Sequence, residues 1–100
     1  MSHAVFAIFT VKPDLMTEFK EFMKGENGLI KTRGFAGCRE ITCSIGGEEN
    51  NIFQVSEKWT SKAEFEAYSA WRGETGFADL AAKFFAEPPV FHHATIDVSL

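Results

Sequence analysis

The stretch NIFQVSEKWTS, residues 51–61, decides the fold, because it carries a strand and the start of a helix in immediate succession. Phe53, Val55 and Trp59 recur at every second or fourth position, which is the period of a strand with one buried face. Ser61 follows, with a glutamate three residues later. This spacing is a capping box, the sequence signature of a helix start. The stretch therefore predicts a domain of mixed α and β structure.

A second strand precedes this one. GFAGCREITCSI, residues 34–45, reads as a strand that the Gly46-Gly47 turn region joins to residues 51–59 as a hairpin with a longish loop. Cys38 and Cys43 lie five residues apart in it, so they would be roughly 16 Å apart on opposite faces. They cannot form a disulfide with each other at that separation. We expect both to be small, buried, apolar side chains.

Residues 4–11, AVFAIFTV, read as the first strand, and both of its faces are apolar. A helix with apolar residues at the helical period follows from Pro13 to about Arg33, and the sequence GENG at 25–28 predicts a kink in it.

The helix that begins after Ser61 is expected to stop at Gly73, and a second helical piece starts at about Thr75. Its apolar side is formed by Phe77, Leu80, Ala81, Phe84 and Phe85, and Pro88 and Pro89 end it. VFHHATIDV, residues 90–98, reads as the last strand.

The resulting order is β-α-β-β-α-β with the second helix broken in two, in a single domain of 100 residues. This is the α+β, ferredoxin-like plan, an antiparallel sheet with helices on one face. The other face would be left to water, although the first strand is apolar on both sides. A second copy of the chain is the simplest cover, so we expect a homodimer.

The charge pattern excludes some partners. The net charge is −4, the pI is about 5.3, and the basic residues are scattered singly. No basic stripe exists to follow a phosphate backbone or an anionic membrane, so nucleic acid is not an expected partner. No segment approaches the ~20 apolar residues of a membrane span, and no signal peptide is recognisable, so we expect a cytoplasmic protein.

One carboxylate interrupts the apolar side of residues 51–59. Glu57 lies between Val55 and Trp59 on that side, and a buried carboxylate must be paired or protonated. We interpret Glu57 first as the partner in a structural ion pair, with Arg72 as the candidate cation. A catalytic base is the alternative.

AYSAWRGETG, residues 67–76, places Tyr68, Trp71 and Arg72 at relative positions i, i+3 and i+4, which share one helical face. Together with Trp59 they would suit a flat, aromatic, oxygen-bearing ligand, because indole and phenol rings stack and a guanidinium binds an oxyanion. Plain core packing of the aromatic rings is the competing interpretation.

His92 and His93 are neighbours in the last predicted strand, so they point to opposite faces and cannot chelate one metal ion as a pair. Either could act as a base near neutral pH, although a lone histidine in a strand is more often structural. The sequence contains no Gly-rich phosphate loop, metal-spaced cluster or nucleophile elbow.

Three segments resemble the antibiotic biosynthesis monooxygenase (ABM) family: KPDLMTEFKEFM, GFAGCREI and FQVSEKWTSKAEFEAY. The motif E-x-W-x-S-x-x-x-(F/L) runs here from Glu57 through Trp59 to Phe65, and an aromatic residue or His follows. The resemblance implies a ferredoxin-like chain that dimerises into an α+β barrel. Trp59 matches the family's strand-three Trp and Glu57 the acid before it, whereas Tyr68 stands where many members have His.

The resemblance further implies oxygenation of a quinol, phenol or anthrone-like compound by O2 without metal, flavin or other cofactor. The catalytic candidates are then Tyr68, Arg72, Glu57, His92 and His93. Trp59, Phe65 and Trp71 are the candidates for substrate binding. Haem degradation fits less well, because residues 61–87 contain no His as axial ligand. A non-catalytic ligand-binding protein or an isomerase on the same fold remains the alternative.

Overall fold

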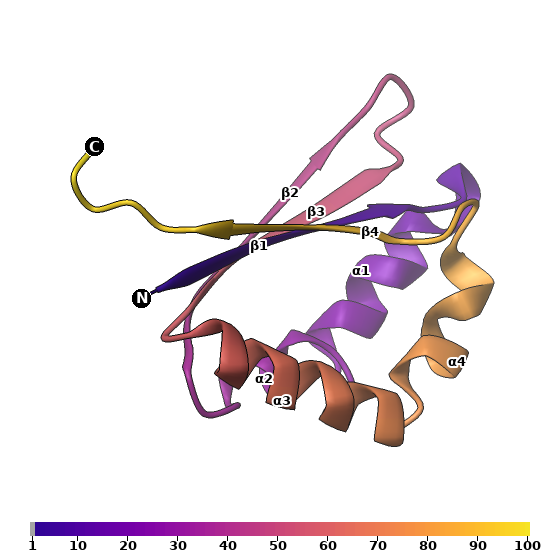
Figure 1. The fold of residues 1–100 in the computed structure, drawn as a ribbon. Helices are drawn as coiled ribbons and strands as arrows, with labels where there is room; N and C mark the ends of the chain where they lie inside the picture. The colour runs from indigo at the N-terminus through magenta and orange to yellow at the C-terminus, as the bar shows by residue number, and fades with distance from the viewer. Residues whose placement is uncertain (1) are drawn as a thin grey trace.

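The structure, a computed structural model, describes residues 2–100, and its centre is a four-stranded antiparallel sheet in the order β2-β3-β1-β4 (Figure 1). The strands are β1 (His3–Thr10), β2 (Cys38–Gly46), β3 (Ile52–Trp59) and β4 (Val90–Thr95). β1 pairs with β3 on one side and with β4 on the other. This order and pairing confirm the ferredoxin-like α+β fold.

All helices lie on one side of this sheet, as Figure 1 shows. They are α1 (Met16–Lys24), α2 (Leu29–Arg33), α3 (Lys62–Glu74) and α4 (Phe77–Ala81), with 3-10 turns at Pro13–Leu15 and Ala82–Phe84. Among residues 2–100 no helix has the length and apolar character needed to cross a membrane.

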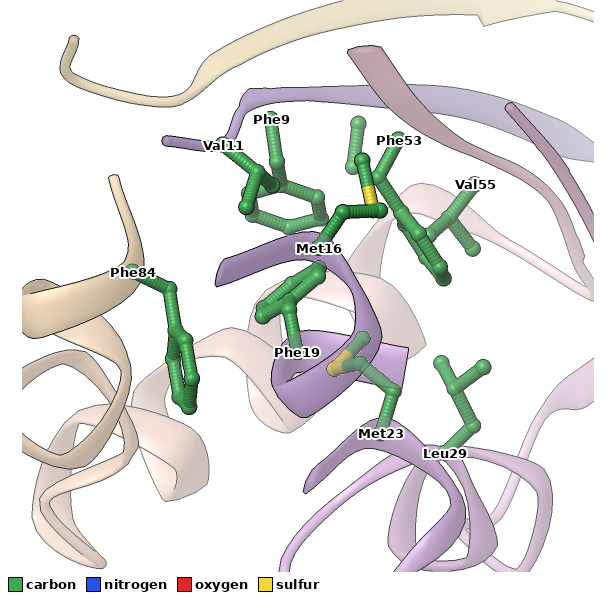
Figure 2. Close-up of a cluster of buried hydrophobic side chains, with 10 residues drawn as sticks. Phe9, Val11, Met16, Phe19, Met23, Leu29, Phe53, Val55 and Phe84 are labelled. Carbon is green, nitrogen blue, oxygen red and sulfur yellow. The ribbon is translucent and has the colours of Figure 1, made fainter. Parts of the chain in front are cut away.

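The core lies between α1 and the two central strands. α1 buries Met16, Phe19 and Met23, which recur at the helical period and therefore share one face. Figure 2 shows Phe19 at the centre of this cluster, beneath Phe9 and Phe53 of the sheet. The Phe19 and Phe53 rings meet edge to face with centroids 5.0 Å apart, a favourable arrangement for aromatic pairs.

The first helical region is two helices rather than the single kinked helix predicted to Arg33. At Gly25 the backbone becomes extended, and its N–H closes the last turn by bonding to the carbonyls of Glu21 and Phe22. Gly28 is buried so closely that an added Cβ would stand 2.1 Å from the carbonyl oxygen of Met23. The sequence between α1 and α2 thus requires glycine because the chain doubles back onto α1.

The second helical region is broken in two as predicted, but at a different residue. α3 continues through Gly73, where we expected a stop, and ends at Glu74. Gly76 makes the turn with a φ of 77°, a left-handed conformation that glycine adopts without strain. The capping box is confirmed, because the Glu64 N–H donates to Ser61 Oγ at 3.3 Å. Leu80 was expected on the apolar side and is instead 47% exposed.

A bulge in β2 overturns the prediction for the cysteines. Cys38 aligns with Trp59 and Cys43 with Val55, and the register shifts between Cys38 and Glu40. Because the bulge adds one residue, both cysteines lie on the helix-facing side rather than on opposite faces. Both thiols are free; Cys38 is half-buried, and Cys43 is exposed rather than buried.

The sheet face opposite the helices is open in the described chain. It carries Phe6 and Ile8 from β1, and their neighbours across the strand pairs include Ser56, Gln54 and Val90. Phe6 is 37% exposed and Val90 49% exposed. The face is therefore partly apolar and without cover within residues 2–100.

Candidate active site

A cavity of about 100 Å³ lies between the sheet and α2, α3 and α4. Its apolar walls include Phe65, and its polar side chains are Thr32, Glu57, Tyr68, Ser69 and Arg72. An apolar hollow with a few converging polar groups is the usual form of a small-molecule site. We therefore treat this cavity as the candidate active site.

Glu57 reaches the cavity from the middle of β3, where it is paired with Val5 of β1 and Ile41 of β2. The residue is 7% exposed, and the indole Nε1–H of Trp59 donates to its Oε1 at 2.8 Å. Burial raises the pKa of the carboxyl, whereas the Trp59 hydrogen bond and the charge of Arg72 lower it. Of the hydrogen bonds found in residues 2–100, none involves Oε2, so the protein leaves the acceptor capacity of this oxygen unused.

The expected ion pair between Glu57 and Arg72 does not form. The salt bridges of the described chain join only exposed residues, and none includes Glu57. The indole of Trp59 is the partner of the carboxyl instead, and Arg72 acts on it only through its charge.

Tyr68 anchors the opposite wall. Its hydroxyl accepts a hydrogen bond from Arg72 Nε at 2.6 Å and lies 2.7 Å from Thr32 Oγ1 of α2. Burial raises the pKa of the Tyr68 phenol, and the hydrogen bonds from Thr32 and Arg72 lower it. The phenol therefore stays protonated at neutral pH and joins α3 to α2.

Arg72 holds the break between α1 and α2. Nη1 donates to the carbonyl of Asn27 at 2.8 Å, and Nη2 donates to the carbonyl of Gly28 at 2.7 Å and to Thr32 Oγ1 at 2.9 Å. With the bond to Tyr68, four of the five N–H donors of the guanidinium are engaged. The guanidinium carbon, Cζ, also lies 4.3 Å from the ring centroid of Phe77, which is a cation–π contact. The group is thus fixed as a positive charge at the cavity wall.

The three aromatic residues expected to bind substrate lie in different places. Phe65 lines the cavity. Trp59 is 0% exposed and packs against Phe65 and Tyr68, with ring centroids 5.6 and 5.0 Å apart, and is not part of the lining. Trp71 lies half-buried beside Phe35, with centroids 5.5 Å apart, also outside the lining.

The two neighbouring histidines lie on opposite sides of the sheet. His92 aligns with Phe6 on the open face, and His93 aligns with Val5 on the helix-facing side. His93 Nδ1 is 2.9 Å from Nε2 of His3. Burial, and then the nearby charge of His93, lowers the pKa of the His3 imidazole. Neither His92 nor His93 lines the cavity beside Glu57.

Sequence reasoning did not assign several of the lining residues to the site, among them Thr32, Phe77 and Phe91. Thr32 lies one helical turn after Leu29, so its spacing on the apolar face of α2 was a usable signal. Phe77 and Phe91 come from α4 and β4, and only the tertiary structure brings them together. Phe9, Phe77 and Phe91 also line a shallower hollow of about 590 Å³ beside Pro88 and Pro89. These three phenylalanines therefore lie between the cavity and the second hollow.

No family model matches the sequence, and no curated protein matches it. Solved structures do match. A conserved protein from Methanosarcina mazei Go1 has a TM-score of 0.81 and 17% identity, over 94% of this chain and 91% of that chain. Rv0793 from Mycobacterium tuberculosis has a TM-score of 0.80 and 16% identity, over 100% of both chains.

A structure from Nitrosomonas europaea named "Putative antibiotic biosynthesis monooxygenase" has a TM-score of 0.77 and 18% identity, over 93% of this chain and 88% of that chain. Further matching structures carry the same name. At such identities the likeness shows the fold. The resemblance to the ABM family seen in the sequence is therefore confirmed at the level of the fold.

Proposed function

We propose that this protein, which has the fold of proteins named antibiotic biosynthesis monooxygenases, oxygenates a small aromatic compound in the cavity beside Glu57. The observation that carries the proposal is the buried Glu57 residue, which lines the cavity; Trp59 bonds to its Oε1, and no hydrogen bond within residues 2–100 uses its Oε2. A carboxylate whose pKa is raised by burial is a stronger base than an exposed one.

Glu57 would remove a proton from a phenolic O–H or an activated C–H group of the substrate. The resulting carbanion or phenolate is electron-rich enough to react with O2. For a substrate methylene group, one molecule of O2 converts the methylene to a carbonyl and releases one molecule of water, so two C–H bonds break and a C=O bond forms. The substrate supplies all four electrons, and the second oxygen atom leaves as that water, so no separate reductant is required.

The opposite wall would stabilise the substrate anion. Tyr68 can offer its hydroxyl to a substrate oxygen, and the Arg72 charge lies close behind it. Most Arg72 donors are already engaged by the protein, so we assign Arg72 to holding Tyr68 and to electrostatic stabilisation. Phe65 would contact the substrate ring, and Trp59 would orient Glu57 from the core. No role in the reaction follows for His92, His93 or Trp71 from their positions.

A homodimer is part of the proposal. Phe6 and Val90 leave apolar surface on the open sheet face, and nothing in residues 2–100 covers it. Burying this face against a second copy would remove apolar area from water at roughly 25 cal/mol per Å². It would also leave the helices, and the cavity beneath them, facing outward.

Oxygen uptake with an anthrone or a naphthoquinol as the test substrate would examine the function directly. Glu57→Gln keeps an oxygen that can accept from Trp59 and removes the base, so turnover should fall by about 10²- to 10⁴-fold with little loss of stability. Tyr68→Phe should lower turnover less. Unchanged turnover in Glu57→Gln would rule out the carboxylate as the base.

The cavity volume favours a second candidate, a protein that binds or isomerises a compound of one ring. A volume of about 100 Å³ lies well below the roughly 300–1,000 Å³ of most sites for drug-sized ligands, so a single ring suits it better than a fused-ring compound. Binding or isomerisation of a phenol without oxygen consumption would support this alternative. Oxygen consumption that depends on Glu57 would exclude it.

A further inference from the structure

A second hollow, which we name the basic groove, lies on the far side of α2 from the candidate active site. It has a volume of about 480 Å³ and runs between α1, α2 and the β2–β3 hairpin. Its floor is the buried side chains of Met23, Leu29 and Phe53. Met23 and Leu29 also line the candidate active site, so these two residues separate the hollows.

The groove leaves apolar side chains in water. Ile30 of α2 is 60% exposed, and Ile45 of β2 is 39% exposed, and the two line the groove from its helical and its strand side. A ligand with an apolar body would remove both from water, as well as the floor. The volume lies within the range of ordinary small-molecule sites.

The charge of the groove is opposite to that of the whole protein. The chain has a net charge of −4, yet the described lining includes Lys20, Lys24 and Arg33 and no Asp or Glu. Lys24 shares an exposed ion pair with Glu21 at 3.4 Å, a geometry that contributes little in water. Lys20 and Arg33 form no salt bridge within residues 2–100.

Arg33 of α2 and Cys43 of β2 line the groove from its helical and its strand side. Although Cys43 is exposed, partial desolvation beside the groove raises the pKa of its thiol, and the charge of Arg33 lowers it. A guanidinium without a carboxylate partner, above apolar walls, is suited to a planar anionic group such as a carboxylate or sulfonate.

We propose that the basic groove binds an amphiphilic anion, a molecule with an apolar chain or ring and one carboxylate or sulfonate group. The apolar part would lie on the floor between Ile30 and Ile45, and the anion would contact Arg33 and Lys20. This site is separate from the cavity beside Glu57.

Titration of the ¹⁵N-labelled protein with decanoate, below the concentration at which it forms micelles, tests the proposal. Amide shifts should concentrate in residues 20–24, 29–33 and 43–45. Arg33→Gln should raise the Kd about tenfold, because a hydrogen bond to a charged group contributes about 1.5 kcal/mol or more. Lys20→Gln, on the exposed face of α1, should also raise the Kd for decanoate. This variant leaves α2 unchanged, so it tests the proposal independently of Arg33. Decan-1-ol, without the charge, should bind as weakly as decanoate binds to Arg33→Gln.

Lys62→Gln is the matched control, because Lys62 is an exposed lysine in a surface ion pair on α3 and should leave the Kd unchanged. Equal binding of decanoate and decanol, or shifts centred on Glu57 and Tyr68, would overturn the proposal. The proposal would also be overturned if the amide shifts in the groove grew with protein concentration in the absence of decanoate. The groove would then bind a second copy of the chain, for instance its exposed Val98 and Leu100.

Discussion

Replacing Arg72 with alanine should destabilise the fold, because the guanidinium joins α3 to the break between α1 and α2. The substitution removes donors from the carbonyls of Asn27 and Gly28 and from the hydroxyls of Thr32 and Tyr68. The Thr32 and Tyr68 hydroxyls still bond to each other, and Asn27 is exposed to water. The main cost in stability therefore comes from the buried Gly28 carbonyl, which loses its donor, and from the Tyr68 hydroxyl, which loses one of its two hydrogen bonds.

An unsatisfied buried acceptor costs about 1–3 kcal/mol, and a lost hydrogen bond about 1 kcal/mol more, so we expect a loss of about 2–4 kcal/mol. A chain of this length has a free energy of unfolding of about 5–15 kcal/mol. The melting temperature should then fall by about 10–25 °C.

Urea denaturation, followed by circular dichroism, measures this loss as a shift of the midpoint at constant slope. Arg39→Ala is the matched control, because Arg39 is exposed on β2 and should change stability by less than about 0.5 kcal/mol. Arg72→Lys keeps the charge but cannot reach four acceptors, so it should recover less than half of the loss. A free energy of unfolding for Arg72→Ala within about 0.5 kcal/mol of the parent protein would refute the reasoning.

Three further predictions follow from other parts of the structure. Because burial raises the pKa of Glu57, the folded state keeps a proton that the unfolded chain has lost. The free energy of unfolding should therefore fall as pH rises from the ordinary pKa of 4.5 to the raised pKa of the folded state. Urea titrations of Glu57→Gln should show no such fall with pH. Phe6→Asp should yield monomers or unfolded protein in sedimentation experiments if the open face is a dimer interface, and a dimer of unchanged affinity would contradict this. Gly28→Ala should cost about 1–3 kcal/mol or more in thermal unfolding because of its contact with Met23, whereas Gly46→Ala, with open space around it, serves as the control and should be nearly neutral.

The sequence predicted the elements whose signals are local. The alternation of Phe53 and Val55 depends on one strand alone, and the capping box at Ser61 depends on four consecutive residues. Neither signal requires contact with a distant segment, and the structure confirms both. The position of Glu57 on the buried side of β3 followed from the same alternation.

Features that depend on close approach of distant segments could not be predicted in this way. The break at Gly28 is fixed by backbone packing against Met23, and the turn between α3 and α4 uses Gly76 although Gly73 looked equally suitable. The bulge after Cys38 reverses the alternation of β2, and nothing in the periodicity of the strand indicates it.

The candidate site was predicted in part for the same reason. Glu57, Tyr68 and Arg72 were recognised as polar groups on apolar faces, and all three line one cavity. Which of them bond to one another depends on the distance between α2 and α3. The role of Thr32 and the carbonyls that Arg72 binds were therefore beyond reach of sequence reasoning.

The hydrogen bond between Trp59 and Glu57 also gives the protein an internal optical reporter. The indole Nε1 lies 2.8 Å from a carboxyl oxygen, so gain or loss of one proton changes the electric field on the chromophore. The chain has two tryptophans, and Trp71→Phe would leave Trp59 as the single source of indole emission. Fluorescence recorded against pH should then follow the ionisation of Glu57 without any label, and a bound substrate that takes up the carboxylate should displace the same titration curve.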